Sequence, residues 1–582
     1  MSLNDNSLRL TKLKDRIIDH LTMIYPDVNQ QDICDQIVNL MDYENIFQEA
    51  QQHCNLWSEN DIVTITYGDS IKKEHELPLE TLHHFISNHL DNVASTIHIL
   101  PFYPYSSDDG FSVINYSEVN QSLGDWTNIN KIADDFSLMA DLVINHCSSR
   151  SLWFDNYRQR KHPGADYFIE VDPEADISQV VRPRTSPLLR ETETLDGTRH
   201  VWCTFSHDQV DLDFGNPKVL LEFVKIIKLY LDNGVNSFRL DAVAFLWKKI
   251  GTPCINLIET HEVIRLLRLL IEHNNPNAIV ITETNIPNKE NLSYFGNANE
   301  AHLIYNFTLP PLILYTMLSG KSALLKQWMM SMPPAQNGTS YFNFIATHDG
   351  IGLRPVEGIL SNDIVDEITT LMKQFGGDVS WRAMPDGGQR PYELNISLID
   401  AMKGTFKGED DFQINRFICA HAIMLALEGI PAFYIHSLFA TENDHQKVTL
   451  SSNKRAINRH NWDYDELTAL LTSNESINHI VFTKLKEIIQ IRKKQKAFHP
   501  NATQFTLHFE QSLFAFWRQS QDRSQSIFCI YNVTDSTQTF ALSDVNLIEL
   551  DNWQDLLTGH KYDEPRENIS LEPYDFVWIS NR

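Results

Sequence analysis

Eight short apolar runs, separated by longer stretches with helical spacing, constrain the fold of this 582-residue chain more than any other feature. The runs occupy residues 61–69, 96–104, 138–146, 235–243, 278–285, 301–307, 341–350 and 430–436. Apolar strands that alternate with helices are typical of a parallel sheet that is buried on both faces. Eight strand–helix units therefore predict an α/β fold, a closed (β/α)8 TIM barrel.

Other parts of the chain predict additions to this barrel. The first residues have helical spacing, whereas the last 80 or so contain short alternating strands without helices between them, which predicts an antiparallel β domain. Two connections, after the third and seventh strands, are too long for an ordinary loop and helix, so they predict inserted subdomains. The expected segments are a helical extension (1–60), three barrel parts (61–146, 223–350, 411–498), two insertions (147–222, 351–410) and the β domain (499–582).

Composition excludes several classes of partner. Lys and Arg total 48 and Asp and Glu total 76, which gives a net charge of −28. Such a chain repels phosphate backbones and anionic lipids, so neither nucleic acid nor a membrane surface is expected as a partner. A small-molecule substrate remains, and an anionic one would require a local cluster of basic side chains. The sequence does not decide between a monomer and a homodimer.

Compartment and cofactors can be addressed in the same way. No apolar run reaches the length of roughly 18 residues that a membrane span requires, and the N-terminal segment lacks a signal-peptide pattern. Seven scattered cysteines without a C-x-x-C pair indicate a reducing cytoplasm. Neither a dinucleotide-binding nor a P-loop glycine pattern is present, so no organic cofactor is expected. The lack of a C-x-x-C pair argues against a zinc ribbon, and no metal is expected.

Charged residues at the ends of the apolar runs are the main functional signal. The third run ends with Asp141 and His146, the fourth with Arg239 and Asp241, the fifth with Glu283, and the seventh with His348 and Asp349. A single Asp at a strand end is more often a helix cap or a turn residue than a catalyst. Capping does not explain several carboxylates, together with His and Arg, at the same end of one barrel.

The spacing of two of these carboxylates matches a known chemistry. Retaining glycoside cleavage requires a nucleophilic carboxylate and a carboxylic acid about 5–5.5 Å apart. Asp241 and Glu283 end consecutive strands, and neighbouring strands lie about 4.8 Å apart. Arg239 faces the same side of its strand as Asp241 and should keep that nucleophile ionised. Burial and neighbouring charge should raise the pKa of Glu283, as an acid catalyst requires.

The strings DLVINH, FRLDAV, ITETN and FIATHDG closely resemble the four signature regions of the α-amylase superfamily of glycoside hydrolases and transglycosidases. The resemblance covers roughly residues 60–500. It implies that Asp241 is the nucleophile, Glu283 the acid/base and Asp349 the carboxylate that stabilises the transition state. It also implies that the glucosyl ring or the carboxylates are held by Asp141, His146, Arg239 and His348.

Further strings resemble the sucrose phosphorylase branch of that superfamily, namely PFYPYSSDDGFSVINY, VVRPRTSP, HDGIGLRPVEG, RPYELN and RAINRHNWD. The resemblance implies that Asp108 and Arg459 hold the terminal glucose and close the pocket, with Phe111 in the same glucose site. Arg184 and Tyr392 match residues of two mobile loops that admit phosphate. Arg184 could instead be an ordinary surface arginine.

Three positions depart from sucrose phosphorylases on the acceptor side. Asn285 replaces a His, Glu393 replaces a Gln, and Arg354 lies where sucrose phosphorylases carry an uncharged, aliphatic stretch. The pattern more closely resembles glucosylglycerate phosphorylases, whose acceptor carries a carboxylate. Arg354 could bind that carboxylate, or it could be a structural arginine paired with Glu357. Arg382 and Arg390 are weaker candidates for the same contact.

The resemblance implies a retaining phosphorylase that transfers glucose from glucosylglycerate to phosphate through a covalent glucosyl–Asp241 intermediate. Sucrose or glucosylglycerol phosphorolysis is the alternative within the branch. An α-glucoside hydrolase and a non-catalytic amylase-like protein are further alternatives. Asn145 could be a calcium ligand as in amylases, although the sucrose phosphorylase branch generally lacks calcium.

Overall fold

The eight predicted runs form one closed parallel barrel. The computed structural model describes residues 3–384, 388–545, 553–564 and 566–582. Each strand pairs with the next, and the last strand pairs with the first. The predicted (β/α)8 barrel is therefore confirmed. In order around the barrel the strands are β1 (Val63–Thr66), β3 (Thr96–Ile99), β4 (Ser137–Leu142), β9 (Val235–Leu240), β10 (Ile279–Thr282), β11 (Leu303–Tyr305), β12 (Ser340–Asn343) and β18 (Ile430–Tyr434).

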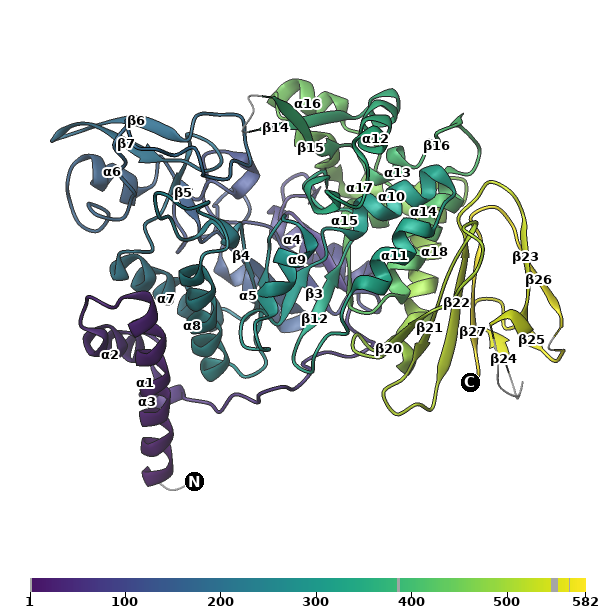
Figure 1. The fold of residues 1–582 in the computed structure, drawn as a ribbon, viewed down its shortest axis with the longest axis horizontal. Helices are drawn as coiled ribbons and strands as arrows, with labels where there is room; N and C mark the ends of the chain where they lie inside the picture. Colours follow the sequence, from purple (N-terminus) through teal and green to yellow (C-terminus); the bar gives the residue numbers. More distant parts are fainter. Residues whose placement is uncertain (1–2, 385–387, 546–552, 565) are drawn as a thin grey trace.

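Helices between the strands cover the outside of the barrel (Figure 1). α7 (Pro217–Asp232) shows why this sequence is helical: Asn216 caps its first turn, Pro217 fits that turn, and apolar residues at helical spacing are buried. The helix α5 (Trp126–Asp135) begins at a capping box in which Asp125 and Asn128 satisfy each other's backbone N–H groups. Other covering helices are α4 (Pro78–His89), α5 (Trp126–Asp135), α8 (Ile258–Asn274), α10 (Leu309–Ser319), α14 (Gln413–Ala426) and α18 (Ile477–Arg492).

The segment between β4 and β9 contains its own short strands. β6 (Leu189–Thr194) and β7 (Gly197–Trp202) form a hairpin that projects from the body (Figure 1). β5 (His146–Ser148) pairs antiparallel with β8 (Gln209–Asp211), and Ser148 lies opposite Gln209. This pairing holds the inserted segment against the carboxyl end of the barrel.

The segment between β12 and β18 forms a second small sheet. β13 (Ile351–Gly352), β15 (Gln389–Asn395) and β14 (Asp378–Ala383) pair antiparallel in that order. Gly352 lies opposite Glu393, so β15 runs directly beside the segment that follows β12. The short helices η4 (Arg354–Val356) and η5 (Lys454–Asn458) and the longer α12 (Asn362–Gln374) surround this sheet.

The two terminal regions lie at opposite ends of the molecule (Figure 1). α1 (Leu3–Ile24) packs on α8, and α2 (Gln30–Leu40) packs on α7. The C-terminal region has a six-stranded sheet with its own apolar core, as predicted. In order, its strands are β20 (Thr503–Thr506), β21 (Leu513–Gln519), β22 (Ser526–Asn532), β27 (Phe576–Ser580), β24 (Trp553–Asp555) and β25 (Lys561–Tyr562). Within the described ranges, no helix is long and apolar enough to cross a membrane.

Candidate active site

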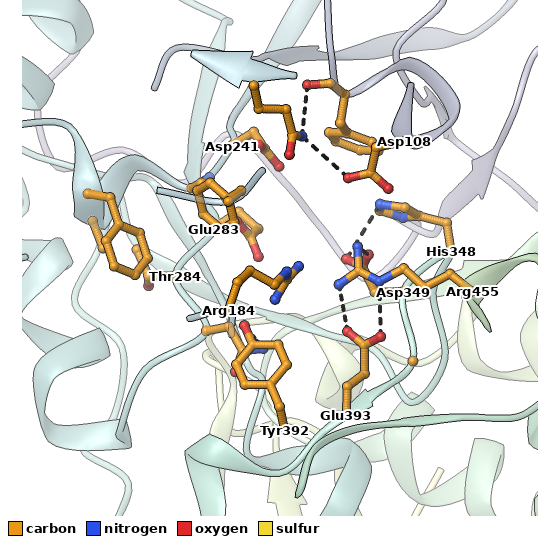
Figure 2. Close-up of a pocket in the computed structure, with 18 of the residues that line it drawn as sticks. Asp108, Arg184, Asp241, Glu283, Thr284, His348, Asp349, Tyr392, Glu393 and Arg455 are labelled. Carbon is orange, nitrogen blue, oxygen red and sulfur yellow. Dashed lines mark hydrogen bonds and ion pairs between the residues drawn. The ribbon is translucent and has the colours of Figure 1, made fainter. Parts of the chain in front are cut away.

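A polar pocket lies at the carboxyl ends of the barrel strands, between the two inserted segments (Figure 2). It holds about 700 Å3 of empty space, including the solvent at its mouth. Most of the side chains predicted from the sequence line it. They are Asp108, Phe111, His146, Arg184, Asp241, Glu283, Asn285, His348, Asp349, Tyr392 and Glu393. Arg239, Arg354 and Arg459 do not line it.

The side chain of Arg239 lies at the floor of the pocket and interacts with carboxylates at the ends of three barrel strands. Its guanidinium is buried and contacts Asp141 on β4, while its Nη1 donates to Asp241 Oδ1 at 2.7 Å. Its Nη2 lies 3.8 Å from Glu283 Oε1. Because Leu240 on β9 lies opposite Thr282 on β10, the residues that follow them are neighbours. Asp241 and Glu283 therefore share one guanidinium at the floor of the pocket.

The two carboxylates differ in their environments. The pKa of Glu283 is raised to about 7, because burial and the charges of Asp241 and Asp349 together outweigh Arg239, which lowers it. Burial also raises the pKa of Asp241, but this group has the closer ion pair with Arg239. Two interacting carboxylates titrate as a pair. We expect the shared proton to reside on Glu283, which suits a general acid.

Asp349 is held ionised by two arginines. Burial alone would raise the pKa of Asp349, but the guanidinium groups of Arg455 and Arg459 outweigh burial and lower it. Arg455 Nη1 lies 2.6 Å from Asp349 Oδ1, whereas the nearest nitrogen of Arg459 lies 3.8 Å away. The pocket-lining arginine of this segment is thus Arg455, which the sequence analysis did not select.

Arg459 is placed differently from the expectation that it would face the glucose. Its guanidinium is buried behind the wall, where Nη1 donates to Asp109 Oδ2 at 2.5 Å and Nε donates to the His348 carbonyl oxygen at 2.9 Å. Asp108 lies 4.0 Å from it. Asp109, the residue next to Asp108, forms the closer ion pair with Arg459. Arg459 therefore lies behind the pocket wall and supports it.

The closed end of the pocket combines aromatic and hydrogen-bonding groups. Phe111 stacks on His348 with 4.9 Å between ring centroids, and His146 Nε2 lies 2.9 Å from the Phe111 carbonyl oxygen. Gln209 Nε2 donates to Asp108 Oδ2 at 3.4 Å and lies 3.2 Å from His146 Nε2. Burial and the nearby arginines lower the pKa of His348 well below its usual value, so its imidazole is neutral.

Some polar atoms in the pocket wall lack partners. Asn285 Oδ1 and His348 Nδ1 are buried and have no hydrogen bond within the described part of the chain. Buried polar atoms are normally paired, because an unpaired one loses its hydration without compensation. In the pocket wall, such atoms are free to bind hydroxyl groups of a ligand.

The opposite side of the pocket holds a guanidinium that forms no ion pair with a carboxylate in the described part of the chain. Arg184 lies 5.1 Å from the ring centroid of Tyr392 and 5.6 Å from that of Phe205. Its Nη1 donates a hydrogen bond to the Pro183 carbonyl oxygen at 3.2 Å. Figure 2 shows this side chain pointing into the pocket beside Tyr392. Arg184 therefore remains available to an anion, and it is not an isolated surface arginine.

Arg354 is a second buried guanidinium near Tyr392. The residue is 9% exposed, and its guanidinium forms no hydrogen bond or ion pair with the described residues. The backbone N–H of Leu353 donates to the Tyr392 carbonyl oxygen at 2.9 Å, which fixes η4 beside the loop tyrosine. Arg382 forms the ion pair with Glu357, so the structural pairing considered for Arg354 is absent. Arg390 is exposed and donates to Asn362 Oδ1 at 3.2 Å.

Glu393 is engaged by a basic side chain. Arg455 Nε and Nη2 donate to its two carboxylate oxygens at 2.9 and 2.6 Å, and Asn395 Nδ2 donates at 2.7 Å. Glu393 is 1% exposed. This bidentate ion pair ties β15, the strand of Tyr392, to the arginine that also contacts Asp349. Arg455 therefore links the acceptor side of the pocket, at Glu393, to the catalytic carboxylate Asp349.

The oxygen cluster that could have held calcium contains a lysine. Lys248 Nζ lies 2.7 Å from Asn145 Oδ1 and 2.7 Å from Asp211 Oδ2. Asp211 also accepts from Thr204 N and Oγ1. A cation of the chain itself thus neutralises this buried carboxylate, and the residues present do not favour an additional divalent cation.

The sequence analysis also missed several neutral wall residues. Phe205, Gln209, Phe245 and Phe307 line the pocket. Gln209 could have been suspected, because it begins the string QVDLDF, in which polar and apolar residues alternate as in a strand with one polar face. The phenylalanines carried no signal, since an aromatic residue after a strand is usually part of the core.

Comparisons with known proteins agree with the signature strings. The family described as "Alpha amylase, catalytic domain" matches residues 87–351. A glucosylglycerate phosphorylase of Spirochaeta thermophila is 41% identical over 89% of this chain and 90% of its own, and one of Escherichia coli is 38% identical over 97% and 100%. The crystal structure of a sucrose 6F-phosphate phosphorylase from Thermoanaerobacter thermosaccharolyticum superposes with a TM-score of 0.71 at 26% identity, over 82% of this chain and 94% of that chain.

Proposed function

The chain belongs to the α-amylase family, in the group of the glucosylglycerate phosphorylases, and from this membership and its pocket we propose that it is a retaining α-glucoside phosphorylase. It would convert glucosylglycerate and inorganic phosphate reversibly into α-glucose 1-phosphate and glycerate. Glucosylglycerate and inorganic phosphate would be its only substrates in this direction, and the reaction would use no organic cofactor.

The proposed reaction has two displacements at one carbon. In the first, Asp241 attacks the anomeric carbon, the bond to the glycerate oxygen breaks, and Glu283 gives that oxygen its proton. In the second, a phosphate oxygen attacks the same carbon, its proton passes to Glu283, and the bond to Asp241 breaks. Two inversions restore the α configuration. Asp349 would stabilise the positive charge that develops on the sugar ring in each transition state.

The observation that carries the phosphorylase proposal is the guanidinium of Arg184. It lies in a pocket that already contains Asp241, Glu283 and Asp349, yet none of the described carboxylates forms an ion pair with it. A hydrolase needs no cation at this place, since its acceptor is water. Phosphate entering a protein with a net charge of −28 does need one. Tyr392 lies against this guanidinium and its hydroxyl is 3.4 Å from Asn285 Nδ2.

We further propose that Arg354 recognises the glycerate carboxylate. A buried guanidinium without a partner is unfavourable, because it has lost hydration and gained no ion pair. A carboxylate ligand would supply two parallel hydrogen bonds to its planar group. The ion pair between Arg382 and Glu357 supports this assignment, since it leaves Arg354 unpaired within the described residues.

The test is an assay of phosphate release from α-glucose 1-phosphate with glycerate, glycerol or fructose as acceptor. We expect the highest kcat/KM with glycerate. Loss of a charge-assisted hydrogen bond of about 1.5–3 kcal/mol in Arg354→Ala should lower kcat/KM with glycerate by roughly 10- to 150-fold and change that with glycerol little. Arg390→Ala is the matched control, because it removes an exposed arginine of the same inserted segment.

Two outcomes would contradict these proposals separately. A wild-type preference for fructose or glycerol would contradict the acceptor assignment and leave the phosphorylase intact. Free glucose as the main product at saturating phosphate would contradict the phosphorylase itself. If Arg390→Ala, and not Arg354→Ala, selectively lowered kcat/KM with glycerate, the residue that binds the carboxylate would be Arg390 on β15.

We also infer a reducing compartment, the cytoplasm, for this enzyme. All seven cysteines are free, and six of them are buried as single thiols. Disulfides would be expected to form and persist in an oxidising compartment. Recovery of the protein with seven titratable thiols after denaturation without reductant would agree with this inference.

A further inference from the structure

Asp208 is a half-buried carboxylate beside the pocket that the proposed mechanism does not use. It lies between β7 and β8, immediately before Gln209. Its carboxylate accepts hydrogen bonds from the hydroxyl groups of Ser106 at 2.5 Å, Ser107, Ser112 at 3.0 Å and Ser149 at 2.7 Å. Four hydroxyl donors on one carboxylate indicate a structural junction rather than solvation.

The four serines belong to two segments of the chain that are far apart in sequence. Ser106, Ser107 and Ser112 lie on the loop after β3, and Ser149 follows β5. The backbone strengthens the junction, because Ser149 N donates to the Asp208 carbonyl oxygen at 2.8 Å. Ser106 Oγ also lies 2.5 Å from Ser148 Oγ. Asp208 thus joins the loop after β3, the end of β5 and the segment that carries Gln209.

The loop held in this way has an unfavourable backbone. Asp108 and Asp109 have φ values of 54° and 47°, and Gly110 has a φ of 112°. Left-handed conformations are rare for residues other than glycine, and they persist where the surrounding structure enforces them. The serines that bind Asp208 flank these three residues on both sides. The hydrogen bonds to Asp208 are therefore well placed to enforce the conformation.

This loop supplies part of the closed end of the pocket. Asp108 and Phe111 line it, and Gln209 Nε2 lies 3.4 Å from Asp108 Oδ2 and 3.3 Å from the Phe111 carbonyl oxygen. We propose that Asp208 is a positioning residue: its hydrogen bonds to four serines hold the loop after β3 so that Asp108 and Phe111 form the glucose end of the pocket. This role concerns the sugar end, whatever the acceptor is.

The charge of Asp208 suits this role. Burial would raise its pKa, but the hydrogen bonds from the four serines outweigh burial and lower it. The group is therefore ionised at neutral pH, and an ionised carboxylate can accept about four hydrogen bonds, whereas an amide offers one acceptor oxygen.

The test compares Asp208→Ala with a matched control, Asp522→Ala. Asp522 also accepts from two serine hydroxyls, Ser520 and Ser524 at 2.7 Å each, but it lies in the C-terminal domain. With α-glucose 1-phosphate as donor, we expect Asp208→Ala to raise KM about tenfold or more and to lower kcat much less. Asp522→Ala should leave both parameters unchanged. The Asp208→Asn variant should fall between Ala and wild type.

A double-mutant cycle separates positioning from a general loss of structure. If Asp208 acts through Asp108, the substitution Asp208→Ala should have little further effect on kcat/KM in an Asp108→Ala background. Equal effects in both backgrounds, or a loss of melting temperature without a change in KM, would overturn the proposal. If Asp208→Ala does not fold, Ser107→Ala and Ser149→Ala replace it, and each should raise KM several-fold. Unchanged KM in both serine variants would also overturn it.

Discussion

The raised pKa of Glu283 predicts that this residue weakens the fold at alkaline pH. In the folded chain its pKa is about 7, against an ordinary value of 4.5. One pKa unit corresponds to about 1.4 kcal/mol, so the difference corresponds to roughly 3 kcal/mol. Below pH 4.5 the group is protonated in both states and has no effect. As pH rises to about 7, the unfolded chain ionises first, so the free energy of unfolding falls by up to that amount.

Glu283→Gln should remove this penalty. Glutamine is neutral at every pH, has nearly the same shape, and can still accept the hydrogen bond from the Ala242 N–H, which is 2.9 Å in the wild type. We expect the variant to exceed the wild type in free energy of unfolding by about 3 kcal/mol at pH 8 and by less than about 1 kcal/mol at pH 5. Urea unfolding followed by tryptophan fluorescence at the two pH values measures the difference.

A substitution with the opposite sign provides the control. Burial would raise the pKa of Glu272, but hydrogen bonds and charges from His302 and Arg268 outweigh burial and lower it to about 2. Glu272→Gln should therefore destabilise the fold at neutral pH. A gain for Glu283→Gln that is equal at pH 5 and pH 8, or no gain at pH 8, would show that Glu283 does not hold a proton in the folded state.

Four further predictions follow from the pocket. Asp241→Ala should abolish glucosyl transfer, measured as phosphate release, and retained activity would exclude it as the nucleophile. The kcat for phosphorolysis should fall above about pH 7, as Glu283 loses its proton. The glucose 1-phosphate that forms when phosphate is the acceptor should be the α anomer, as measured by NMR. A β product would exclude a mechanism with two displacements. Lys248→Ala should lower the melting temperature, because it leaves Asp211 buried and unpaired; an unchanged melting temperature would show that Lys248 does not stabilise that site.

The barrel and the position of the carboxylates were predictable because both depend on local patterns. Each strand is a continuous apolar run, and a polar residue directly after such a run has to lie at the strand end. Asp241 and Glu283 are therefore brought together by strand register alone. The physical rule needs no knowledge of distant contacts.

The arginines were less predictable, since their partners come from elsewhere in the chain. Arg455 and Arg459 lie one short helical turn apart. Arg459 forms an ion pair with Asp109 on a distant loop, whereas Arg455 lines the pocket. Arg354 has Glu357 three residues away, but Arg382 on β14 forms that ion pair. Sequence spacing indicates which pairs are possible, and the tertiary fold selects among them.

The ion pair of Glu393 with Arg455 has a consequence for how such a pocket changes over evolutionary time. Removing Arg455 alone leaves the buried Glu393 carboxylate without its counter-charge, which costs about 3–5 kcal/mol, and this is a large share of the stability of a typical domain. Removing Glu393 alone leaves Arg455 with Asp349 as its remaining ion-pair partner. Arg455 therefore cannot change independently of Glu393, whereas exposed neighbours such as Arg390 can. A lineage that alters this acceptor wall has to exchange both residues, and a loop transplanted here from another enzyme should be inherited together with its matching partner.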